Sequence, residues 1–316
     1  AGAPPPTPRR RWSAESGFSM PEVVVATMLT IMISGAATQA LMHMTKAQKS
    51  IWNRAEMHAG VRGATELLQQ EIGQAGRVSL PGAVSTTAAA TAGATTISVS
   101  STDGMFVGEK LMLGAGNTSE NVVVSAIAGT TLTVDSAATG AGTGIGNAHA
   151  AGVPVSALGG FSAGIIPPSF GNGSTSTTLK LFGDINSDGR MLYVEYTCDT
   201  ARGKLLRRVM PWNAAVKVPL ASAGVLLGNI LPNPGSAPCF RYQEQIVGPR
   251  IFVTGVSVTL TVQTLQRDPN TNQYQVETKN LLSVSPRTVF ESWELASQNV
   301  VDRVQPTPPS ITALLP

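Results

Sequence analysis

Charged residues are scarce in this chain: they make up 13% of its 316 residues, and the net charge is only +3. No basic stripe with interleaved aromatic residues occurs, so we expect no nucleic-acid partner. Histidine is scarcer still: His43, His58 and His149 lie far apart, and no nucleophile-elbow sequence accompanies them. No glycine-rich loop ends in Gly-Lys-Ser/Thr, which excludes a P-loop ATPase. We therefore expect no enzymatic activity, and no cofactor except the calcium ion considered below.

The abundant residues are small ones. Glycine alone contributes 32 residues, and Thr, Ser and Ala are also common, as in many extracellular β-rich proteins. A chain of this length can bury a sizeable core in one large or two modest domains. The composition therefore favours an exported structural protein.

One long stretch, residues 23–44, contains no charged side chain, and Arg9, Arg10 and Arg11 lie before it. At 1.5 Å per residue, a helix over this stretch reaches roughly 33 Å, about the thickness of the hydrocarbon core of a bilayer. The arginines should hold the preceding end in the cytoplasm. We predict a single transmembrane helix at about 21–44, with the rest of the chain outside the cytoplasm.

A small residue precedes this apolar stretch. Secretory signal peptides carry their small-residue cleavage site after the apolar run, whereas Gly17 comes before it. The sequence GFSMPE at 17–22 resembles the type IV prepilin signal, which implies a leader over 1–17, cleavage by a prepilin peptidase after Gly17, and N-methylation of Phe18. Pro21 departs from the usual Leu or Thr, but proline suits a first helical turn.

Glu22 has two interpretations. A carboxylate in the first turn complements the helix dipole, whatever else it does. An ionisable group at the edge of a bilayer is also costly and usually has a partner. The resemblance implies that Glu22 pairs with the freed amine of Phe18, often that of a neighbouring subunit, and so sets the register of assembly.

We expect one helix over 18–77. Beyond the transmembrane part it becomes amphipathic, because Val61, Ala64, Leu68, Ile72 and Ala75 recur at spacings of three and four. One face of this second half should pack against a globular body.

Strands are expected after the helix. Alternation of apolar and polar residues predicts short strands at 95–100, 110–113, 121–127 and 131–134. This stretch resembles a small β module of phage-tail and surface proteins, and we treat 83–158 as an insertion.

The body, over 159–304, should contain strands at 179–182, 191–197, 204–209, 240–243, 251–265 and 274–284. Short connections imply an antiparallel sheet packed on the helix, so the predicted fold class is α+β with an inserted small β module. Three prolines after Val304 predict a loose tail over 305–316.

The second half of the chain resembles PilW-type minor pilins. A turn rich in Asp, Asn and Gly is followed by YVEY at 193–196 and GKLLRR at 203–208, and later by VSVTLTV at 256–262 and VSPR at 284–287. The type II secretion pseudopilin GspJ shares this plan.

The two cysteines, Cys198 and Cys239, both fall in the part expected outside the cytoplasm, where disulfides persist. We expect them to pair. The alternative is two buried thiols that never meet, since sequence fixes neither distance nor geometry.

A candidate calcium site lies at Asp184, Asn186 and Asp188, with Glu195 at the twelfth position of an EF-hand-like pattern. The flanking residues are predicted strands rather than helices, so Glu195 would lie roughly 20 Å beyond the turn. A polar hairpin turn is the favoured interpretation, and a calcium site remains the alternative.

The resemblance implies a minor pilin, held in the inner membrane and then incorporated into a type IV pilus or priming its assembly. Its partners would be other pilin subunits, through the N-terminal helix, and the prepilin peptidase. Two alternatives stay open: a GspJ-like type II secretion pseudopilin, and a filament-borne adhesin that acts through the inserted module.

Overall fold

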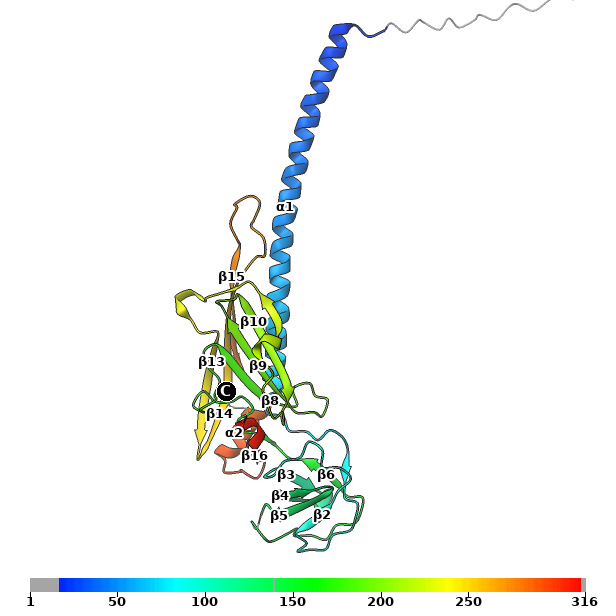
Figure 1. Ribbon diagram of the computed structural model, residues 1–316, viewed down its shortest axis with the longest axis vertical. Helices are drawn as coiled ribbons and strands as arrows, with labels where there is room; N and C mark the ends of the chain where they lie inside the picture. The colour runs from blue at the N-terminus through cyan, green and yellow to red at the C-terminus, as the bar shows by residue number, and fades with distance from the viewer. Residues whose placement is uncertain (1–16, 139, 314–316) are drawn as a thin grey trace, which may run out of the picture. The chain divides into compact units, whose positions relative to one another are not determined.

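The structure, a computed structural model, describes residues 17–138 and 140–313. The expected leader, 1–17, therefore lies outside the described residues except for Gly17. The fold class is α+β, as predicted: a long helix precedes antiparallel sheets, and a separate small sheet is inserted between them (Figure 1).

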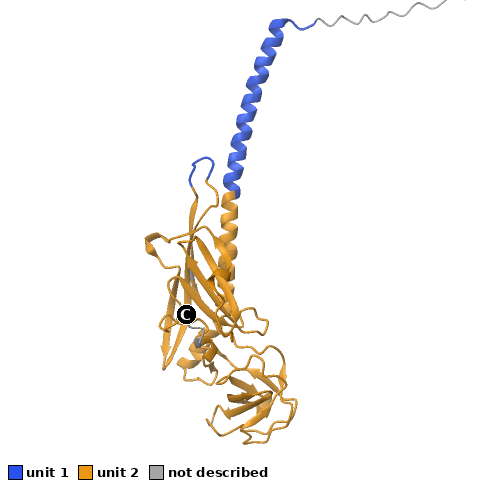
Figure 2. Ribbon diagram, viewed as in Figure 1, with its two compact units in different colours: residues 1–52, 268–273 blue, residues 53–267, 274–316 orange. Residues whose placement is uncertain are grey.

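Helix α1 runs from Met20 to Gln74, without a break over 55 residues. It starts two residues later and ends three residues earlier than the predicted 18–77. The chain divides into two compact units: residues 1–52 with 268–273, and residues 53–267 with 274–316 (Figure 2). The helix crosses from the first unit into the second after Trp52, and its two parts differ in burial.

All buried side chains of α1 belong to its second part. They are Met57, Val61, Ala64, Thr65, Leu68, Glu71 and Ile72. Their spacing of three and four residues places them on one face, as the sequence pattern predicted. This face packs on a core that also contains strand residues of two sheets, including Val194, Leu205, Phe240 and Val256.

Two sheets share this core. The first has the order β11-β10-β9-β8, all antiparallel, from β8 (Thr178–Gly183), β9 (Leu192–Asp199), β10 (Lys204–Pro211) and β11 (Gly224–Gly228). The second is built around β14 (Arg250–Gln263), which pairs with β12 (Ile230–Leu231), β13 (Phe240–Val247) and β15 (Val276–Val284).

A third sheet forms the inserted module. Its order is β1-β6-β3-β4-β5-β2, from β1 (Val84–Ser85), β2 (Thr96–Ser98), β3 (Lys110–Leu113), β4 (Glu120–Ala128), β5 (Thr131–Ser136) and β6 (Pro154–Ala157). Alternate residues of β3 and β5 are buried in a hydrophobic cluster of the module's own, with Leu111, Val124 and Val134 among its members. The first and last strands, β1 and β6, pair with each other, Val84 opposite Val155.

The end of the chain differs from the prediction of a loose tail over 305–316. Strand β16 (Val304–Gln305) pairs in parallel with β7 (Gly160–Phe161), and a short helix α3 (Pro309–Ala313) follows. The side chain of Gln305 is fully buried and accepts a hydrogen bond from the Lys110 amide at 2.9 Å. Its amide group donates to the carbonyls of Lys110 and Leu158 at 2.7 and 2.6 Å. The prolines of the tail limit the backbone after Gln305, but they do not prevent this glutamine, which precedes them, from packing.

Helix α2 (Arg287–Ser297) was not predicted. It covers β14 and buries Val289, Ser292 and Ala296. Three short 3₁₀ turns complete the described elements: η1 (Gly116–Thr118), η2 (Leu220–Ser222) and η3 (Pro234–Ser236).

Candidate functional site

The predicted cleavage site lies just before α1, in residues that belong to no helix or strand. Phe18 is 82% exposed, and apart from the two chain neighbours no described residue lies within 4 Å of where a Cβ on Gly17 would stand. Both residues of the predicted cleavage bond are therefore exposed.

Glu22 closes the first turn of the helix. Its carboxylate accepts from the backbone N–H of Ser19 at 3.3 Å and from the Ser19 hydroxyl at 3.4 Å. This is one half of a capping box, in which the glutamate reaches back to the residue that caps the helix. The Ser-x-x-Glu spacing at 19–22 is the sequence signal of this contact. The predicted pairing with a Phe18 amine requires cleavage after Gly17; in the uncleaved chain that nitrogen is in a peptide bond, so the pairing stays a prediction.

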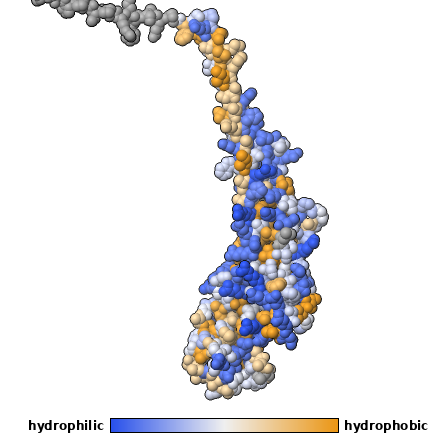
Figure 3. Space-filling view, turned by 180° about the vertical axis from the view of Figure 1, so that it is seen from behind, coloured by the Kyte–Doolittle hydropathy of each residue, from blue (hydrophilic) through white to orange (hydrophobic). Residues whose placement is uncertain are grey.

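The first part of α1 exposes an apolar surface (Figure 3). By length and composition it is a helix that could cross a membrane, and none of its most apolar stretch is buried against other described residues. Its threonine hydroxyls are satisfied inside the helix: Thr27, Thr30 and Thr38 donate to carbonyls one turn earlier, at 2.8 to 2.9 Å. Such internal bonds let polar side chains enter lipid without unpaired groups.

The second part of α1 is fixed to the sheet by a buried carboxylate. Glu71 is 3% exposed and forms an ion pair with Arg207 of β10. The Tyr196 hydroxyl of β9 donates to the same carboxylate at 2.5 Å. Burial, and then the neighbouring Glu71 charge, raises the pKa of Tyr196 above its usual range. Sequence reasoning missed this cluster, although an acid among the apolar residues of the buried stripe was a signal.

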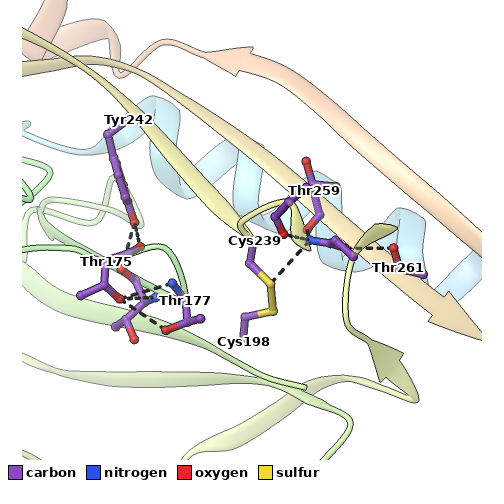
Figure 4. Close-up of a disulfide and its surroundings, with 10 residues drawn as sticks. Thr175, Thr177, Cys198, Cys239, Tyr242, Thr259 and Thr261 are labelled. Atoms are coloured by element: carbon purple, nitrogen blue, oxygen red, sulfur yellow. Dashed lines mark hydrogen bonds between the residues drawn. A yellow bond between two sulfur atoms is a disulfide. The ribbon is translucent and has the colours of Figure 1, made fainter. Parts of the chain in front are cut away.

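Cys198 and Cys239 form a disulfide, as expected (Figure 4). Cys198 lies in β9 and Cys239 immediately precedes β13, so the bond joins the two sheets of the body. Asn233 lies beside it and links the neighbouring backbone: its amide donates to the Thr259 carbonyl at 2.9 Å, while its oxygen accepts from Thr261.

The candidate calcium residues form the turn between β8 and β9. Asp184, 1% exposed, accepts from the amides of Asp188 and Gly189 at 3.0 and 3.3 Å and from the Ser79 hydroxyl at 2.7 Å. Asp188 accepts from the Arg190 amide. These carboxylates are therefore used in building the turn. No group of three or more His, Cys, Asp or Glu suited to a metal occurs among the described residues.

Glu195, the twelfth position of that pattern, lies elsewhere, in a buried cluster on β9. Arg208 and Lys217 form ion pairs with it, and the Tyr193 hydroxyl donates to it at 2.7 Å. Lys180, on the adjacent strand, donates instead to the Asn172 carbonyl at 2.8 Å. Burial, helped by the charges of Lys217 and Arg208, lowers the pKa of Lys180 to about 8.

His149 is buried in the inserted module and contacts a carboxylate there. It is 4% exposed, and its Nε2 lies 2.8 Å from Glu120, which also accepts from the amides of Gly146 and Asn147. These contacts close the last loop of the inserted module.

The comparisons with known proteins give no family. No protein-family model matches the chain, and comparison with curated proteins and with solved structures also finds no match.

Proposed function

We propose that this chain is a minor subunit of a type IV pilus or a related filament, made as a membrane-inserted precursor and matured by cleavage after Gly17. One observation carries the proposal. An exposed Gly17-Phe18 bond stands directly before a single helix whose first part is apolar and unburied and whose second part is fixed to a β body. Such a helix can lie in lipid first and among the helices of other subunits later, because both surroundings accept an apolar surface.

The disulfide supports export of the body. Structural disulfides persist in oxidising compartments and are rare in the cytoplasm. The bond between Cys198 and Cys239 therefore agrees with the orientation inferred from Arg9, Arg10 and Arg11. In this proposal the helix spans the inner membrane and the β body lies outside the cytoplasm.

Glu22 would act at the assembly step. The capping contact with Ser19 holds its carboxylate at the start of the helix, one residue from the nitrogen that cleavage would free. A new Phe18 amine, on this or a neighbouring subunit, would be a stronger partner for the carboxylate than the neutral donors of Ser19.

The deciding experiment is mass spectrometry of the mature N-terminus, from cells with and without the prepilin peptidase. The expected product begins at Phe18 and carries one N-methyl group, and Gly17→Val should leave the precursor uncut. Gly35→Val, within the transmembrane part, is the matched control and should be cut normally. An intact leader in peptidase-positive cells, or a cut beyond Met44, would remove the proposal.

A filament-borne adhesin is the second candidate, because the module has its own hydrophobic cluster and adjoining ends. Val84 and Val155 are paired, so the two ends are about 5 Å apart and a short Gly-Ser link can replace the module. If cells with this deletion still make pili but no longer attach to surfaces, the module acts in adhesion. Loss of piliation would assign the module to assembly, and neighbouring genes would separate a pilus from a secretion system.

A further inference from the structure

The turn between β14 and β15 is attached to helix α1 near the end of its apolar part. The Ser50 hydroxyl donates to Oδ2 of Asp268 at 2.5 Å. The other oxygen of the same carboxylate accepts from the amides of Asn270 and Thr271 at 2.8 and 3.3 Å. Asp268 therefore both shapes the turn and joins it to the helix.

The turn and this part of the helix belong to one compact unit, separate from the rest of the body. In Figure 2 the turn rises beside the helix, with its tip directed toward the apolar part. The residues at the tip, 270–273, are polar and exposed.

The helix around this contact has the composition of a membrane interface. Lys46 and Lys49 are exposed and Trp52 is 73% exposed. Lys46 lies four residues before Ser50 and three before Lys49, so Lys46 shares a helix face with the residue that holds the turn, and Lys49 lies on its other side. Trp52 follows Lys49 by three residues. Tryptophan and lysine are the residues that anchor helices at the headgroup level.

Distances along the helix place Lys46 at this level. The headgroup layer on each side of a bilayer is roughly 5–7 Å thick. If the apolar part ends at Met44, Lys46 lies about 3 Å beyond it, within that layer, whereas Lys49 and Ser50 lie about 7.5 and 9 Å beyond it, just outside the layer. Side chains on a helix lean toward its N-terminus, so Trp52 also reaches back toward the membrane.

We propose that Lys46, Lys49, Trp52 and the turn Asp268–Gln273 form a membrane-contact surface that rests on anionic phospholipid headgroups. This inference depends on the proposed membrane anchor. It adds a second point of contact, made by the β body's own hairpin. Two attachment points fix the direction of the hairpin against the membrane before the subunit leaves it.

The test uses the full chain reconstituted in phosphatidylcholine vesicles with and without phosphatidylglycerol. Because neither described cysteine is free, Asn270→Cys supplies a single thiol for an environment-sensitive fluorophore. Spin-labelled lipid headgroups should quench this label when phosphatidylglycerol is present, and added salt should weaken the quenching. Quenching reports how much of the protein has the turn in contact with headgroups. Replacing both lysines by glutamine should lower the ratio of protein with the turn in contact to protein with the turn out of contact by about fivefold or more.

Ser50→Ala tests the link to the helix, because it removes the hydroxyl that holds Asp268. It should reduce quenching, whereas Thr45→Ala should not, since among the described residues the Thr45 hydroxyl bonds within the helix, to the Leu41 carbonyl, at 2.8 Å. Hydrogen exchange of residues 23–44 reports insertion separately. A protected helix with an unquenched label would overturn this inference alone, and an unprotected helix would overturn the membrane anchor itself.

Discussion

Glu71 of the long helix and Arg207 of strand β10 form an ion pair across the interface between helix and sheet, 136 residues apart in sequence. Apolar side chains alone would allow the helix to pack on the sheet at several positions along its length. The ion pair favours one of them, because a buried carboxylate is stable only next to a group that balances its charge. One acid in a hydrophobic stripe therefore helps to fix the position of the helix on the sheet.

Removing this acid should loosen the helix. Glu71→Ala leaves Arg207 and the Tyr196 hydroxyl without their partner, and we expect a loss of about 2–4 kcal/mol of unfolding free energy. Urea denaturation in detergent measures it. Glu66→Ala is the matched control on the same helix, since its pair with Arg62 is exposed and contributes about 0.5 kcal/mol or less. Equal losses in the two variants would contradict the assignment.

Reduction of the disulfide should also destabilise the body. The bond closes a loop of 41 residues, for which chain entropy gives a stabilisation of about 4 kcal/mol at most. We expect Cys198→Ala with Cys239→Ala to lower the melting temperature, and dithiothreitol to lower that of the native chain but not of the variant. A native chain that melts at the same temperature with and without reductant would count against a structural role.

Glu109 should make the inserted module sensitive to alkaline pH. Its side chain is fully buried, one oxygen has no hydrogen-bond partner among the described residues, and the other accepts from the Phe106 amide. Burial raises the pKa of Glu109 from 4.5 to about 8. The folded state therefore holds the proton more tightly than the unfolded state, so this contribution to stability is complete below about pH 4.5 and is lost as pH rises through 8.

The variant Glu109→Gln removes the titration. It should be more stable than the native chain at pH 9, by up to about 4 kcal/mol, with a smaller difference at pH 4. Melting curves across this range measure the effect. A difference between the two proteins that does not change with pH would show that Glu109 does not titrate in this window.

Calcium should leave the β8–β9 turn unchanged. Since Asp184 already accepts from two turn amides and Ser79, millimolar calcium should shift the melting temperature by less than about 1 °C. Asp184→Asn should destabilise the chain to the same extent with and without calcium. A calcium-dependent rise in the native chain that Asp184→Asn abolishes would restore the metal site.

Periodic patterns predicted most of the fold. The helix followed from spacings of three and four, and the strands from alternation, because burial of one face imposes both periods. Helix α2 was not predicted, although Val289, Trp293 and Ala296 recur at spacings of four and three and pack in one hydrophobic cluster.

Contacts between distant residues could not be predicted in this way. The pairs Glu71 with Arg207 and Gln305 with Lys110 join positions far apart in sequence, and no local pattern encodes such a partner. The cysteine pair was the exception, since only two cysteines exist and the expected compartment favours their oxidation. The Ser19–Glu22 contact could be predicted from the sequence, because the two residues lie three positions apart. The Ser50–Asp268 contact could not, because the residues are 218 positions apart and only the fold brings them together.

The position of Gln305 in the chain also bears on the order of folding. Its side chain connects the inserted module to the body through Lys110 and Leu158, yet it lies 147 residues after Leu158 in sequence. A chain synthesised from its N-terminus contains all six strands of the module before this glutamine is added. The module can therefore fold first, and the contacts that connect it to the body through Gln305 form afterwards.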